Sequence, residues 1–163
     1  MPEQLRHKEF SALERPRELV LVCPPFRSHI NFSRIVRLAG CTAIEKIITN
    51  GTGKVDPAIA RAAADHVQIE RRRSLPPVLK SMAQQGYRIV GLEQTDNSVS
   101  IHHYSFFRRT ALLIGNERLG IEPELLELVD DVVEIPVYGP PHSYNVASAA
   151  IMAVYEYCKQ HPT

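Results

Sequence analysis

The feature that most constrains the fold is a regular alternation of short apolar segments with segments of helical spacing. The most apolar segment, TALLIG at 110–115, is typical of a strand buried on both faces of a parallel sheet. The alternation predicts one α/β domain over residues 1–163, with a mostly parallel sheet and helices on both faces. The expected strands are 18–22, 43–49, 67–70, 87–92, 110–115 and 132–135, and the expected helices are 31–39, a short one opening at Asp56-Pro57, 74–85, 123–129 and 145–160.

Capping residues predict where several helices begin and end. Asn31 is the expected N-cap of the first long helix, and Gly40 is expected to end it. Ser143 or Asn145 is the expected N-cap of the last helix. The polar stretch 93–109 has no periodicity that assigns it to either class.

Size and composition exclude several classes of protein. With 163 residues, 44% of them hydrophobic and 23% charged, the chain fits one globular domain. Its N-terminus has no apolar signal core, and no apolar run approaches the roughly 18 residues of a membrane span. Three widely spaced cysteines predict reduced thiols in a cytoplasmic protein, with neither a disulfide framework nor a metal site.

Charge is unevenly distributed along the chain. Positions 54–88 contain seven Lys or Arg and three Asp or Glu. Positions 116–134 contain one Arg and seven Asp or Glu. The basic segment contains the run Arg71-Arg72-Arg73, which can lie along a phosphate backbone with Arg34. Most charge runs are solvated, so the run taken alone favours a solvated surface over a phosphate contact, and both interpretations remain open.

Three short segments follow strands, at the edge of the sheet where ligands bind in α/β folds. The first is N-x5-R, from Asn31 to Arg37; the second is G-x-E-x-x-G, carried by Gly115, Glu117 and Gly120. The third runs through residues 135–146 into a helix. Each has an ordinary structural explanation, as a helix cap, a strand exit or a loop. Neither the Walker motif nor Gly-x-Gly-x-x-Gly is present.

In their order and spacing the three segments resemble the motifs of SpoU/TrmH-type RNA 2′-O-ribose methyltransferases, within the SPOUT class. The third segment resembles that family's I-P-M-x-G-x-x-x-S-L-N-V-S motif. The resemblance implies a C-terminal deep trefoil knot, S-adenosylmethionine as cofactor, tRNA or rRNA as substrate and no metal. The implied cofactor-binding residues are Leu92, Gly115, Glu117, Gly120, Ile135, Ser143, Tyr144 and Val146.

The resemblance also implies a catalytic set, which comprises Arg37, Asn31, Glu117, Ser143 and Asn145. An arginine stays protonated, so Arg37 is expected to stabilise the developing oxyanion of the ribose hydroxyl rather than remove its proton. Two alternatives remain: a SPOUT enzyme that methylates a base, and a non-catalytic RNA-binding knot protein.

A homodimer is expected, because the family places each site at a subunit boundary. Small residues in the last helix, which permit close helix approach, point the same way. They are Ala147, Ala149, Ala150 and Ala153.

Overall fold

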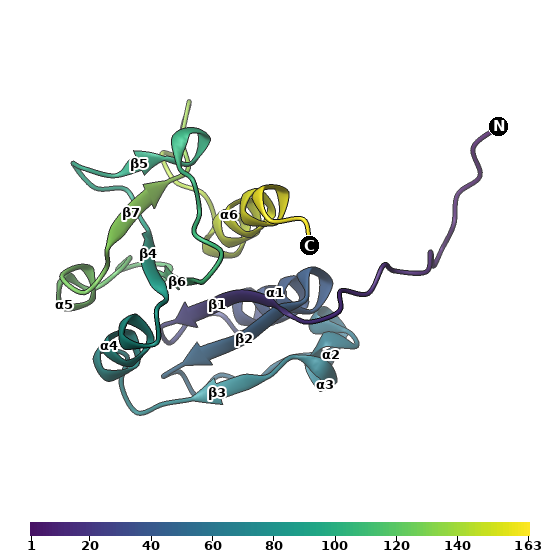
Figure 1. Ribbon diagram of the computed structural model, residues 1–163, viewed down its shortest axis with the longest axis horizontal. Coiled ribbons are helices and arrows are strands. Elements are labelled where there is room, and N and C mark those ends of the chain that lie inside the picture. Colours follow the sequence, from purple (N-terminus) through teal and green to yellow (C-terminus); the bar gives the residue numbers. More distant parts are fainter.

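A seven-stranded sheet runs through the middle of the protein, and every pair of neighbouring strands is parallel (Figure 1). The computed structural model describes residues 1–163. The strand order is β3-β2-β1-β6-β4-β7-β5. The expected α/β class and parallel sheet are confirmed. The strands are β1 (Arg17–Cys23), β2 (Ile44–Thr49), β3 (Ile69–Arg71), β4 (Arg88–Leu92), β5 (Val99–Ser100), β6 (Thr110–Ile114) and β7 (Asp131–Glu134).

Helices cover both faces of the sheet (Figure 1). One face packs against α1 (His29–Thr42), α2 (Pro57–Ala60), α3 (Ala63–His66) and α6 (Val146–Gln160). The opposite face packs against α4 (Pro76–Gln84) and α5 (Pro123–Leu126). Alternate residues of the central strand β6 enter the two cores: Leu112 and Ile114 on the α1 side, Ala111 and Leu113 on the α4 side. This burial on both faces explains its unbroken apolar sequence.

Helix α1 differs from the prediction at both ends. Its N-cap is Ser28, whose Oγ accepts hydrogen bonds from the backbone N–H groups of residues 30 and 31, so the assignment of Asn31 as the cap was wrong. The helix also continues past Gly40 to Thr42. Gly40 instead permits close packing, because a Cβ there would lie 2.6 Å from the Cβ of Ala63 in α3.

Other predicted boundaries are closer to the structure. Asp56 caps α2 with Pro57 in its first turn, and Asn145, not Ser143, caps α6. The unassigned stretch 93–109 contains β5 and a single 3-10 turn at Ile101–His103. None of the helices combines the length and apolarity that crossing a membrane requires.

The alanines of α6 do not have the environment that was predicted for them. Ala147, Ala150 and Ala153 are almost completely buried in the core that includes α1. Their small size therefore permits α6 to approach α1 within one chain, and the inference of a subunit contact was wrong for these three alanines. Ala149 is partly buried and does not decide the question.

Candidate active site

A cavity of about 290 Å³ lies beyond the carboxyl ends of three neighbouring strands, β6, β4 and β7. The loops after these strands and the first turns of α6 form its walls. This is the edge of a parallel sheet at which ligands bind. The structure brings together here every residue expected to bind a cofactor, namely Leu92, Gly115, Glu117, Gly120, Ile135, Ser143, Tyr144 and Val146.

The walls of the cavity combine apolar side chains with exposed polar groups. Leu92, Ile114, Ile135 and Val146 provide apolar surface, and the 115–120 loop provides backbone and polar side chains. Such a lining suits a ligand that combines an apolar part with hydrogen-bonding groups.

The loop after β6 folds back on itself through its two glycines. Backbone hydrogen bonds join Asn116 to Gly120 in both directions, at 2.9 and 3.0 Å. A Cβ on Gly115 would lie 2.7 Å from the carbonyl carbon of Gly120. The absence of a side chain at Gly115 therefore lets the backbone of Gly120 pack against it. Gly120 has φ +66°, and a Cβ there would collide with the carboxylate of Glu93.

Glu93 is a member of the site that the sequence interpretation missed. Its carboxylate accepts hydrogen bonds from the backbone N–H groups of Ile121 and Gln94, each at 2.9 Å. These contacts tie the loop after β4 to the end of the glycine loop. The available signal was its position, because Glu93 directly follows a buried strand at the carboxyl edge of the sheet.

A chain of hydrogen bonds connects the three predicted motifs beside the cavity. The Asn31 side-chain amide donates to Glu117 Oε1 at 3.2 Å, and Asn145 Nδ2 donates to Asn31 Oδ1 at 3.1 Å. The Asn145 oxygen accepts from two backbone N–H groups of α6. Asn31 is 7% exposed, so its amide has few alternatives to these partners. The motifs thus fix the relative positions of α1, α6 and the glycine loop.

Glu117 also holds the loop that leads into α1. Its two carboxylate oxygens accept the backbone N–H groups of Arg27 at 2.9 Å and Ser28 at 3.0 Å. Partial burial alone would raise the pKa of this carboxyl. The hydrogen bonds from backbone N–H groups and from Asn31 outweigh burial and lower the pKa below its usual value. Glu117 is therefore an ionised acceptor at neutral pH.

Two expected catalytic residues stand apart from this hydrogen-bonded chain. Arg37 is exposed on α1, about 240° around the helix and about 9 Å along it from Asn31. Its guanidinium makes no hydrogen bond or ion pair within the chain. Ser143 lines the cavity but is exposed, and the Tyr144 hydroxyl donates to the carbonyl of Pro136 at 3.3 Å.

The run of three arginines is divided between different environments. Arg71 donates to the carbonyls of Gly51 at 2.6 Å and Gly53 at 2.9 Å, so it holds a loop of its own chain. Arg72 pairs with Glu70, whereas Arg73 is exposed and makes no polar contact. Arg34 is likewise exposed, on α1.

Comparisons with known proteins agree with this geometry. The chain is 30% identical over 133 residues to the tRNA (guanosine(18)-2′-O)-methyltransferase of Escherichia coli strain K12, and the match covers 80% of this chain and 58% of that enzyme. The chain thus spans a little over half the length of this relative.

Solved structures share the fold. The Aquifex aeolicus TrmH/SpoU tRNA modifying enzyme superposes with a TM-score of 0.86 at 26% identity, over 91% of this chain and 78% of that one. The SpoU methyltransferase AviRb of Streptomyces viridochromogenes, in complex with AdoMet, superposes with a TM-score of 0.75 at 24% identity, over 93% and 60%.

A family model also matches most of the chain. The model of the SpoU rRNA Methylase family matches residues 18–155, which extend from β1 into α6 and include all three motifs. The family predicted from motif order and spacing is confirmed: the chain belongs to the SpoU rRNA methylase family.

Proposed function

We propose that the protein transfers a methyl group from S-adenosylmethionine to a ribose 2′-hydroxyl of tRNA or rRNA. The observation that carries this proposal is the hydrogen-bonded chain Glu117–Asn31–Asn145 beside a cavity lined by all eight expected cofactor residues. The names of the relatives support it, since the E. coli enzyme is named as a tRNA 2′-O-methyltransferase. A cytoplasmic location and a C-terminal trefoil knot, in which the three loops around the cavity are threaded, belong to the same proposal.

The cavity fits the proposed cofactor. Leu92, Ile135 and Val146 offer apolar surface to an adenine ring, and the 115–120 loop offers backbone groups to its polar edge. Ser143 and Tyr144 lie in the loop that closes the cavity. S-adenosylmethionine supplies an electrophilic methyl group when it is bound. The protein must then position the ribose hydroxyl and stabilise the charge that develops on it.

Arg37 is the proposed charge stabiliser, and Asn31, Glu117 and Asn145 are positioning residues. A guanidinium stays protonated, so it stabilises an oxyanion without accepting a proton. Glu117 and Asn145 hold Asn31 and the start of α1 in place. This arrangement provides the preorganisation that methyl transfer to a weak nucleophile needs.

Because Arg37 is exposed and does not line the cavity of its own chain, we propose that it completes the site of a second copy in a homodimer. The outer surface of α1 and α6 carries exposed apolar side chains, with Ile30 41%, Ile151 43% and Tyr155 72% exposed. Arg37 lies on the same helix as Ile30. A two-fold interface over this surface would bury the apolar groups and bring Arg37 to its partner's site.

Mixing two inactive variants tests the dimeric site. Arg37→Ala should retain cofactor binding but lose about 10²–10³ in rate, as for loss of one preorganised charge stabiliser. Gly120→Val should lose cofactor binding and keep Arg37. If Arg37 acts on the partner, random re-association of equal amounts restores about a quarter of wild-type activity, because half the dimers are mixed and each has one complete site. No restored activity in demonstrably mixed dimers would place Arg37 in its own chain's site.

The activity itself is tested with purified protein, methyl-labelled S-adenosylmethionine and either bulk tRNA or rRNA. Nucleoside analysis of the labelled RNA should find a 2′-O-methylated nucleoside. A methylated base would favour the alternative class of SPOUT enzyme. RNA and cofactor binding without transfer to any RNA would favour a non-catalytic binding protein.

A further inference from the structure

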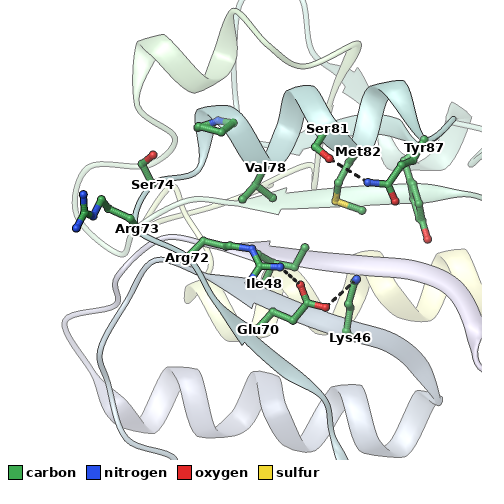
Figure 2. A pocket seen from close by; sticks show the side chains of 12 residues that line it. Lys46, Ile48, Glu70, Arg72, Arg73, Ser74, Val78, Ser81, Met82 and Tyr87 are labelled. Atoms are coloured by element: carbon green, nitrogen blue, oxygen red, sulfur yellow. Dashed lines mark hydrogen bonds and ion pairs between the residues drawn. The ribbon is translucent and has the colours of Figure 1, made fainter.

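A second hollow, of about 330 Å³, lies on the opposite side of the sheet from α1, away from the candidate active site (Figure 2). Helix α4 forms one wall, and β2 and β3 form the other. Arg73 and Ser74 lie at one end, and Tyr87 lies at the other (Figure 2). None of its lining residues belongs to the cavity described above. We call this hollow the basic groove.

Strand geometry explains why the basic groove is polar. Successive side chains on a strand point to opposite faces, so Glu70 and Arg72 face α4, whereas Arg71 faces α1 and lies 5.9 Å from the ring of Phe32. The apolar core under α4 includes Ile48 of β2 and no residue of β3. Charged side chains therefore form the uncovered edge of the sheet on this side.

The charges of the basic groove do not balance. Glu70 accepts from Lys46 Nζ at 2.9 Å and from Arg72 Nη2 at 2.7 Å. Its side chain is 19% exposed, whereas that of Arg72 is 52% exposed. Arg73 has no ion-pair partner within the chain. The groove thus contains three cations and one carboxylate, and only two of the cations pair with that carboxylate. The carboxylate is the more covered group, so the groove presents positive charge to solvent.

We propose that the basic groove binds backbone phosphates of the RNA substrate, outside the nucleotide that is methylated. This inference rests on the proposed function. Arginine, lysine and serine side chains are the usual phosphate contacts, and they position a nucleic acid without reading its sequence. Arg72, Arg73 and Ser74 supply these groups at one end of the groove, and Lys46 supplies one further in. Arg71 is excluded, because its guanidinium is used by carbonyls of its own chain.

The position of the groove suits a flanking segment of the same RNA. Arg72 and Arg73 directly follow β3, and all strands are parallel, so these residues lie at the same edge of the sheet as the candidate active site. Three strand spacings separate β3 from β6 and four separate β3 from β4, which corresponds to about 14–19 Å. An RNA strand with one nucleotide at the cavity therefore reaches the groove along the edge of the sheet.

The test is the salt dependence of RNA binding by the double variant Arg72→Gln/Arg73→Gln. Fluorescently labelled bulk tRNA and an rRNA fragment serve as probes, with fluorescence anisotropy measured over a range of KCl concentrations. Loss of two phosphate contacts should reduce the slope of log K against log salt by about 1.4–1.8 and weaken binding about 25–60-fold at 0.1 M salt. The affinity for S-adenosylmethionine should not change.

The matched control is Lys80→Gln/Lys159→Gln, which also removes two positive charges. Lys80 is exposed on α4 but does not line the groove, and Lys159 lies at the end of α6. This control should keep the wild-type slope. An equal loss in the control, or an unchanged slope in the arginine variant while the wild type still methylates RNA, overturns the groove proposal alone. If the wild type neither binds nor methylates tRNA or rRNA, the proposed function fails as well.

Discussion

Replacing Glu117 by alanine should destabilise the protein measurably, because one carboxylate accepts hydrogen bonds from three donors in the segment 27–31. Glu117→Ala leaves the N–H of Ser28 and the amide of Asn31 without an acceptor, and both are partly buried. Each unsatisfied donor costs about 1 kcal/mol or slightly more. The N–H of Arg27 is exposed and returns to water. The total is about 2–3 kcal/mol, which lowers the melting temperature of a domain of this size by about 4–12 °C.

Differential scanning calorimetry at several pH values tests this reasoning. The folded-state pKa of Glu117 is lowered from 4.5, so its contribution is complete above pH 4.5 and is lost as the pH falls through the folded pKa. The melting temperatures of wild type and variant should therefore differ fully at pH 7 and converge in acid. Glu127→Ala, which removes an exposed acid at the end of α5, is the matched control and should melt like the wild type. A difference below 1 °C at pH 7, by the same scale of about 2–4 °C per kcal/mol, would refute the assignment of Glu117 as an anchor.

Three further substitutions or reactions test other parts of the site and core. Gly120→Ala places a side chain at a position with left-handed backbone, against the carboxylate of Glu93. The strain of about 1–3 kcal/mol should weaken cofactor binding, measured by calorimetry, by about tenfold or more. The control Gly53→Ala, whose Cβ meets nothing within 4 Å, should bind the cofactor like the wild type. Asn145→Asp keeps the oxygen that caps α6 but loses the donor to α1, so methyl transfer should fall by about tenfold or more while the melting temperature stays near that of the wild type. A thiol reagent should modify the exposed Cys41 in the native protein and reach Cys23 only after unfolding, because complete burial raises the pKa of that thiol.

The fold was predictable where local signals and tertiary contacts agree. The apolar run at 110–115 indicated a central strand because both of its faces are covered. Local signals failed where a residue contacts a partner that is distant in the sequence. Asn31 is of a residue type that often caps helices, but its side-chain amide forms hydrogen bonds with Glu117 and Asn145. Ser28 caps the helix instead. Gly40 has the character of a helix breaker, but it accommodates α3.

The cofactor wall of the site was predictable because motif order and spacing mark loops that meet at one edge of the sheet. Its internal supports were not. Glu93 has no motif partner, and its role depends on Gly120 folding back beside it. The different environments of the three arginines at 71–73 could not be predicted from the sequence either. Successive side chains of a strand point to opposite faces, but only the structure shows which face is covered by helices.

The hydrogen bonds that join the three motifs have a consequence for biosynthesis. Asn31 lies 86 positions from Glu117 and 114 positions from Asn145, so these contacts have high sequence separation and close long loops of the chain. A growing chain that already contains the six strands up to β6 still lacks Asn145, which provides the last of these hydrogen bonds. The hydrogen bonds beside the candidate active site are therefore complete only when α6 has been synthesised and has docked against α1, so an unfinished chain lacks the complete site.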